Sequence, residues 1–493
     1  MLIELLRIQD ICAILALIIM YIVVGYRPPW LWKHIEKRQM TIADIPGPLS
    51  IPFLGTRWIF WFKNYSISKL HEVYADLFLQ YGPIIKEETL FNIPVVSVVK
   101  RCDIERVLKS SGKYPVRPPT EAIAHYRRSR PDRYASGGIV NEQGVVWHHL
   151  RMNLTSELTS TRTIAGFAPV IDQIVEEWCS LIKLQRVSGK YIEDLKPLAE
   201  RLGLEVTCAL VLGRRMGFLQ PNGTSPTTQA LSVAVHEHFL ACRDTFYGLP
   251  FWKVWQTPAY NHLVRGEEAI YTLALELIES ANEETEQSAI FQSVLRANID
   301  NREKTVAIVD FIAAGIYTLG NSVVFLLHLI ASHEECQRKL LDDLNNGSTT
   351  YLKACINEAF RIIPTAYCLA RVTEQDLELS GYYLKAGTVV LCHAGLACQG
   401  NDNFQDAHLF NPDRWIGESK ANTVSTATYL VIPFGIGKRI CPGRRFVEQV
   451  LVSLLSNVVR EFHFTCIDDL KLQFEFLLAP KGPVAMNFVD QNI

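Results

Sequence analysis

The sequence has no C-x-x-C pair, no zinc-finger spacing and no long run of charges of one sign. Its 12 cysteines are scattered from Cys12 to Cys466, and its formal net charge at pH 7 is only -2. The weak charge argues against nucleic acid as the main partner. Because a chain of 493 residues does not need disulfides as staples, we interpret all but one of the cysteines as free thiols in a reducing compartment.

Internal repeats and low-complexity tracts are also absent from the sequence. Hydrophobic residues make up 48% of the chain and charged residues 20%, a balance that allows a sizeable core and argues against disorder. We therefore expect one continuous globular body at residues 53–493.

An uncharged stretch near the N-terminus, from Ile11 to Tyr26, is apolar enough to enter a membrane. As a helix it would be about 24 Å long, slightly shorter than the roughly 30 Å hydrocarbon core of a bilayer. The basic residues that follow favour an uncleaved membrane anchor at residues 1–26, with the body on the cytoplasmic side. The alternatives are a cleavable secretory signal, although no small-residue cleavage site follows, and a transit peptide, although the segment is not rich in arginine.

Residues 27–52 combine basic side chains with closely spaced prolines. The basic residues and prolines include Arg27, Lys33, Lys37, Arg38, Pro46, Pro48 and Pro52. Prolines this dense restrict the backbone and exclude helix. We expect a stiff linker between the anchor and the body.

The segment FGIGKRICPG at residues 434–443 is the most informative in the chain. It fits the pattern F-x-x-G-x-R-x-C-x-G, whose fixed positions are Phe434, Gly437, Arg439, Cys441 and Gly443. At average residue frequencies, such a match would arise by chance in about one of several thousand proteins of this length. Chance is therefore a poor explanation of the pattern.

This segment resembles the haem-ligand loop of the cytochrome P-450 family. The resemblance implies haem b as cofactor and the Cys441 thiolate as axial ligand of the iron, where it favours O–O cleavage. Arg439 would pair with a haem propionate, and Phe434 would shield the sulfur from water. Gly437 and Gly443 allow the turn that delivers Cys441, and a helix starting after Gly443 helps to keep the thiol ionised. The implied fold is mainly α with small β-sheets, a single haem-enclosing globule.

Further propionate contacts are implied by the same resemblance. Trp147 and Arg151 match W-x-x-x-R, and one helical turn separates them, so that the two side chains can share a face. Arg371 matches another position at which the family contacts a propionate.

A buried structural cluster is also implied. Glu358 and Arg361 form an E-x-x-R motif, whose spacing puts both charges on one face of a helix, and Arg414 lies in F-x-P-x-R. In the family these three side chains lock the haem side of the core. Removing one would leave a buried charge unpaired, at a cost of several kcal/mol.

The apolar stretch from about Val306 to Ser332 resembles the oxygen-activation helix of the family. Gly315, Tyr317 and Thr318 match the catalytic motif A-G-x-D/E-T, except that Tyr317 stands where the family usually has a carboxylate. Because oxygen cleavage consumes protons, we expect Thr318 to assist proton delivery and the missing acid to slow it. Replacing Tyr317 by glutamate is therefore expected to raise the product formed per NADPH.

Around Cys441 the sequence resembles the mitochondrial class of the family, in which a double arginine commonly follows the ligand loop. Arg444 and Arg445 occupy those positions, and Lys353 matches the first of two lysines that dock an acidic ferredoxin. Asn357 stands where the second lysine would be, and this loss of a positive charge should slow association with the ferredoxin. The implied electron donor is an adrenodoxin-like ferredoxin with its NADPH reductase, or NADPH-cytochrome P-450 reductase. For the location of the protein, the ligand loop around Cys441 favours a mitochondrial membrane, whereas the predicted anchor at residues 1–26 favours the endoplasmic reticulum.

Three longer stretches, 68–77, 113–144 and 310–333, resemble the arthropod ecdysone 20-monooxygenases, a branch of the family that hydroxylates ecdysone to 20-hydroxyecdysone. The implied function is steroid hydroxylation with O2 and electrons from NADPH. The alternatives are another mitochondrial-class steroid or xenobiotic hydroxylase, and a haem protein that binds a sterol or rearranges a peroxide. Four arginines of the second stretch, Arg127, Arg128, Arg130 and Arg133, are expected in a solvated loop and not at a ligand site.

Near the C-terminus, apolar residues alternate with polar ones, which predicts a strand. The apolar positions are Leu470, Leu472, Phe474 and Phe476. The Pro-Lys-Gly-Pro sequence at 480–483 is expected to turn the chain back. The resemblance implies that the turn of this hairpin borders the substrate pocket.

Overall fold

A computed structural model describes residues 39–62, 65–221, 226–282 and 288–491. The predicted anchor and residues 27–38 of the predicted linker lie outside the described residues. The described chain divides into two compact units, residues 39–110 with 370–393 and residues 111–369 with 394–491. The body predicted at 53–493 therefore includes most of both units.

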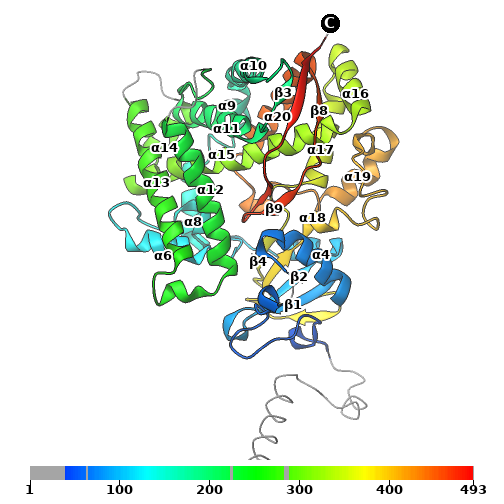
Figure 1. Ribbon diagram of the computed structural model, residues 1–493. Helices are drawn as coiled ribbons and strands as arrows, with labels where there is room; N and C mark the ends of the chain where they lie inside the picture. The colour runs from blue at the N-terminus through cyan, green and yellow to red at the C-terminus, as the bar shows by residue number, and fades with distance from the viewer. Residues whose placement is uncertain (1–38, 63–64, 222–225, 283–287, 492–493) are drawn as a thin grey trace, which may run out of the picture. The chain divides into compact units, whose positions relative to one another are not determined.

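The first unit is built on a four-stranded sheet in the order β1-β2-β7-β4 (Figure 1). Its elements are η1 (Ile42–Asp44), α3 (Ile59–Phe62), η2 (Ile67–Lys69), α4 (Leu70–Tyr81), β1 (Ile84–Glu88), η3 (Leu90–Asn92), β2 (Pro94–Val98), α5 (Arg101–Lys109), β4 (Leu369–Val372), β5 (Leu377–Leu379), β6 (Tyr382–Leu384) and β7 (Val389–Cys392). β1 and β2 are antiparallel, with Ile84 opposite Val98. β2 and β7 are parallel, and β5 and β6 form a separate antiparallel pair.

The second unit is mainly helical (Figure 1). Its helices are α6 (Glu121–Ser129), α7 (Gly138–Asn141), α8 (Gly144–Leu154), α9 (Thr161–Gly166), α10 (Ala168–Gln185), α11 (Leu195–Leu212), α12 (Pro226–Tyr247), η4 (Pro250–Lys253), α13 (Pro258–Asn282), α14 (Ala289–Arg296), α15 (Asn301–Ala331), α16 (Glu334–Asn345), α17 (Thr350–Ile362), α18 (Ala394–Ala397), η5 (Pro412–Trp415), η6 (Gly417–Ser419), α19 (Lys420–Ala427), η7 (Gly437–Arg439) and α20 (Arg444–Glu461). Its strands are β3 (Tyr191–Ile192), β8 (Phe462–Cys466), β9 (Leu472–Phe474), β10 (Leu478–Pro480) and β11 (Met486–Asp490). They form a β3-β11-β8 sheet and a β9-β10 hairpin. The expected fold class, mainly α with small sheets, is confirmed.

The core of the second unit forms around α15, which packs along α11. Close approach of the two helices depends on glycine: a Cβ on Gly203 of α11 would lie 3.0 Å from the Ile316 carbonyl oxygen of α15. Within the part of the chain that the structure describes, α15 is the one helix long and apolar enough to cross a membrane. It is a core helix, because 78% of its most apolar window is buried inside the protein.

α10 shows how the apolar pattern of the sequence produces the helices of this unit. Its buried side chains recur at helical spacing and give the helix an apolar stripe facing the core. They are Ile171, Ile174, Val175, Trp178, Cys179, Leu181 and Ile182. Phe167 occupies the N-cap position without a side-chain hydrogen bond, and a proline lies in the first turn, where the missing backbone N–H costs nothing.

Two local expectations are corrected by this unit. Arg127 is 6% exposed on α6 and forms ion pairs with Glu267 of α13 (3.0 Å) and Asp310 of α15 (2.7 Å). The expectation of a solvated loop is wrong for this residue, because two distant helices supply buried carboxylates.

The C-terminal hairpin turns at residues 475–477, where Leu478 pairs with Phe474, and not at 480–483.

Candidate functional site

Cys441 lies in a tight loop that ends at the start of α20. The Cys441 N–H donates to the Phe434 carbonyl oxygen over 2.8 Å, which closes the loop. Gly435 and Gly437 adopt φ angles of 72° and 73°, a left-handed conformation that would be strained in a residue with a side chain. Gly443 caps α20. Gly435 and Gly437 therefore set the path of the backbone before the cysteine, whereas Gly443, with φ -80°, adopts a conformation open to any residue.

The Cys441 thiol is surrounded by protein and yet accessible. Among the described cysteines, all of which are free, only Cys102 and Cys441 are exposed. Burial raises the pKa of the Cys441 thiol above that of an ordinary cysteine, and the backbone N–H of Gly443, the charge of Arg151 and the backbone N–H of Arg444 offset part of this rise. These groups favour the thiolate, which is the form that binds a metal.

The donors at Cys441 fit haem better than a metal held by protein alone. Among the residues that the structure describes, no group of three or more His, Cys, Asp or Glu side chains could hold a metal ion. A metal at Cys441 must therefore take its other ligands from a bound group, as a porphyrin provides them.

Three of the four predicted propionate contacts come together beside the loop. The Arg439 guanidinium lies 3.8 Å from the centroid of the Trp147 ring. Arg151, one turn along α8 from Trp147, donates from Nη2 to the Ile440 carbonyl oxygen over 2.9 Å, and burial lowers its pKa. Two guanidinium groups are thus held next to Cys441, where carboxylates of a ligand would offset the cost of burying them.

Arg371 belongs to the first unit. It is buried in β4, and its Nη1 donates to the Ala370 carbonyl oxygen over 2.8 Å. Burial lowers its pKa. Its contact with a propionate stays a prediction.

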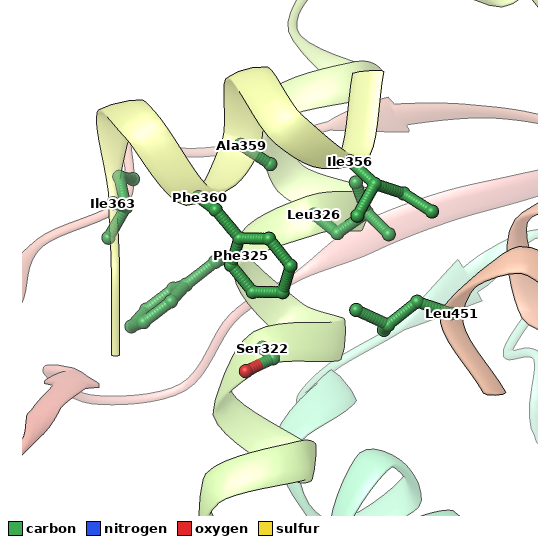
Figure 2. Close-up of a pocket in the computed structure, with 8 residues that line it drawn as sticks. All are labelled: Ser322, Phe325, Leu326, Ile356, Ala359, Phe360, Ile363 and Leu451. Carbon is green, nitrogen blue, oxygen red and sulfur yellow. The ribbon is translucent and has the colours of Figure 1, made fainter. Parts of the chain in front are cut away.

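An apolar pocket lies between α15, α17 and α20 (Figure 2). Its lining residues are Ser322, Phe325, Leu326, Ile356, Ala359, Phe360, Ile363 and Leu451. Figure 2 shows the Phe360 ring pointing into the space between the α15 side chains and Leu451. The ring of Phe360 also meets the ring of Phe434 edge-on, with centroids 5.3 Å apart. Phe434, which begins the ligand loop, thus contacts one of the residues that line this pocket.

The three predicted catalytic residues of α15 have different surroundings. The Thr318 Oγ1 donates to the Ala314 carbonyl oxygen over 2.6 Å, on a face of α15 where Ala314 is exposed. Gly315 faces α11, and a Cβ there would lie 2.2 Å from Thr207 Oγ1. Tyr317 is 4% exposed and packs against Phe239 of α12. Close helix packing accounts for the glycine at 315, and its catalytic role stays a prediction.

Glu358 is the centre of a fully buried polar cluster. It accepts hydrogen bonds from Arg361 Nη2 (2.8 Å), Arg414 Nε (3.0 Å) and Trp415 Nε1 (2.8 Å). The backbone N–H of Asn411 also donates to it. Glu358 and Arg361 are 0% exposed. All three members of the predicted structural cluster therefore meet at one carboxylate, and the loop at 405–415 is tied to α17 through it.

The residues predicted to dock a redox partner are on the surface of the second unit. Lys353 and Asn357 are both exposed and lie one turn apart on α17. Arg444 forms an ion pair with Glu448 over 2.8 Å, and Arg445 donates to the Thr159 carbonyl oxygen. Two of these three cations thus have partners within the chain.

Two residues of this region were missed by the sequence analysis. Glu475, at the turn of the β9-β10 hairpin, accepts a hydrogen bond from Tyr317 Oη. His236 of α12 contacts the same carboxylate, with 3.0 Å between Nε2 and Oε2. Glu475 stands in an alternating apolar and polar pattern, which assigns it to a solvated face, so that the sequence carries no signal for its burial.

The comparisons with known proteins cover nearly all of the chain. The cytochrome P450 family model matches residues 45–488. Ecdysone 20-monooxygenase of Drosophila melanogaster is 45% identical, covering 92% of this chain and 90% of that protein. Cytochrome P450 302a1, mitochondrial, also of Drosophila melanogaster, is 29% identical over 91% of this chain and 96% of its own length.

Among solved structures, the retinoic acid bound cyanobacterial CYP120A1 superposes with a TM-score of 0.73. It covers 92% of this chain and 100% of its own, at 17% identity, and shows the same fold. The Cys441 loop and its guanidinium neighbours agree with the family match. The chain belongs to the cytochrome P450 family and is a haem-dependent monooxygenase.

Proposed function

We propose that this monooxygenase hydroxylates ecdysone to 20-hydroxyecdysone. The observation that carries the proposal is the similarity to Drosophila ecdysone 20-monooxygenase, which extends over 92% of this chain. Haem b, when bound, supplies the activation of O2 and the insertion of one oxygen atom into a C–H bond.

The chain's own residues would hold and shield that group. The Cys441 thiolate would bind the haem iron, and the guanidinium groups of Arg151 and Arg439 would hold its anionic propionates. The apolar side chains of α15, α17 and α20 exclude water. Thr318 places a hydroxyl on the exposed face of α15, where it can hold a proton.

Turnover of ecdysone by the haem-loaded full chain tests the substrate. With NADPH and a complete redox system, we expect 20-hydroxyecdysone as the main product by mass spectrometry. Hydroxylation at a different carbon, or turnover of other steroids only, would assign the chain to another steroid hydroxylase. Conversion of a peroxide without any electron donor would favour a haem protein that rearranges peroxides.

For the electron donor and the membrane, the proposal is an adrenodoxin-like ferredoxin at a mitochondrial membrane. The exposed Lys353 and the mitochondrial relative support it. We expect the ferredoxin pair to sustain faster turnover than NADPH-cytochrome P-450 reductase at equal concentration. The reverse order, with the protein in the endoplasmic reticulum fraction of cells, would contradict this proposal.

Replacing Asn357 by lysine is expected to speed ferredoxin binding. The new charge would lie one turn from Lys353 on α17, and paired basic residues at a docking surface steer the encounter with an acidic partner. In stopped-flow experiments at low salt we expect the association rate to rise about threefold, with a steeper salt dependence. Gln185→Lys, the same charge change at an exposed position of α10, is the matched control. Equal acceleration by both variants would show that only net charge matters.

A further inference from the structure

A buried carboxylate lies against the oxygen-activation helix although the helix itself lacks one. Glu475, 3% exposed, accepts a hydrogen bond from Tyr317 Oη of α15 and pairs with His236 of α12. Three elements far apart in the sequence therefore converge on one side chain. The pairing occurs at the residue that replaces the usual acid of the family motif.

The cluster formed by His236, Glu475 and Tyr317 reaches solvent at one end. The side chain of His236 is 44% exposed, whereas that of Glu475 is 4% exposed. Tyr317 is buried, and its ring stacks on those of Phe239 (4.9 Å) and His236 (5.8 Å). Aromatic packing holds the phenol in place, and the hydrogen bonds connect an exposed imidazole with the interior.

The charges around the cluster favour a proton on His236. The hydrogen bond to Glu475 raises the pKa of His236, and Glu200 adds to this effect while Lys196 opposes it. Burial raises the pKa of Glu475, but the hydrogen bonds from His236 and Tyr317 and the charges of His236 and Arg243 lower it overall. Both shifts favour an imidazolium–carboxylate pair over the two neutral groups.

Tyr317 itself remains a neutral phenol. Burial and the nearby negative charge of Glu475 raise its pKa far above neutral pH. Asn321, one turn along α15, lowers the Tyr317 pKa by a side-chain hydrogen bond and donates to the Leu478 carbonyl oxygen over 3.4 Å. The phenol can therefore take part in proton transfer only by giving one proton while accepting another.

We propose that Glu475 supplies the carboxylate that α15 lacks, and that His236, Glu475 and Tyr317 pass protons from solvent to this helix. The imidazolium of His236 gives its Nε2 proton to Glu475 and takes a new proton from a hydronium ion of the solvent. Tyr317 Oη, which donates to Glu475 at rest, takes the proton of Glu475 while its own hydrogen passes to a water molecule beside α15. One proton thus enters from hydronium and leaves as hydronium, and each of the three side chains ends in its starting state. The inference rests on the proposed function, because protons are consumed only as O2 is reduced.

The first test measures protonation directly and needs no turnover. In haem-loaded protein labelled with [13Cε1]histidine, the His236 signal is assigned by its loss in His236→Asn and titrated by NMR. Glu475→Gln is expected to lower the His236 pKa toward that of an isolated histidine, and Glu461→Gln is expected to leave it unchanged. Glu461 is a matched control because it pairs with Lys183 on the surface. An unaltered His236 titration in Glu475→Gln would overturn the proposal.

The second test separates proton delivery from substrate binding and from folding. In Glu475→Gln, product per NADPH is expected to fall about tenfold, while turnover supported by iodosylbenzene, which needs no protons, and the Kd for ecdysone stay at wild-type values. Glu475→Asp should restore part of the loss. A weaker Kd with normal coupling would make the cluster a substrate-recognition site, and equal loss in both assays would make it purely structural; either result contradicts the proposal. Failure of wild-type protein to hydroxylate ecdysone would refute the proposed substrate, while the NMR titration would still decide this inference.

Discussion

Replacing Glu358 by alanine is expected to lower the free energy of unfolding by about 3–5 kcal/mol. The change removes the shared acceptor of Arg361, Arg414 and the Trp415 indole, all buried. The two guanidinium groups would keep their backbone carbonyl partners but lose their counter-charge. Urea unfolding followed by circular dichroism measures the effect, and the yield of haem-loaded protein should fall with it.

The chain contains a matched control for this change. Glu335 and Arg338 of α16 have the same i,i+3 spacing as Glu358 and Arg361, but their side chains are 59% and 65% exposed instead of 0%. Because solvent screens an exposed pair, we expect Glu335→Ala to leave the unfolding curve unchanged. Equal effects of the two substitutions would refute a stabilising role for the buried cluster.

Replacing Cys441 by serine is expected to abolish NADPH-supported hydroxylation, to the level of a reaction without the enzyme. A serine hydroxyl does not ionise near neutral pH and cannot donate electron density as a thiolate does. The loop itself should survive, because its closure depends on the backbone bond to Phe434 and on the glycines. Cys102→Ser, at the other cysteine that is exposed among the described residues, should retain full turnover. Loss of activity in both variants would indicate a general effect of removing surface thiols.

Much of this site could be predicted from the sequence because its parts are local. The turn around Cys441 is determined by glycines within a few residues, and the Glu358–Arg361 contact follows from one turn of helix. The family resemblance then added the distant partner Arg414. In each case either neighbouring residues or a known motif carried the information.

The buried charges that the sequence analysis missed are contacts between distant segments. Glu475 lies 158 residues from Tyr317, and a strand pattern assigns its side chain to solvent. Arg127 likewise meets Asp310 across 183 residues. With Glu475 in place, the sequence-based expectation for Tyr317→Glu changes: a second carboxylate would face the first in a buried site, so that we no longer expect coupling to rise.

The central claim is that the Cys441 thiolate binds the haem iron. The most direct measurement is the absorption spectrum of the reduced, carbon monoxide-bound protein, recorded for wild type, Cys102→Ser and Cys441→Ser at equal haem content. The red-shifted Soret band of a thiolate-ligated haem should be present in the first two proteins and absent from the third. If Cys441→Ser keeps that band, another residue ligates the iron and Cys441 is not the axial ligand.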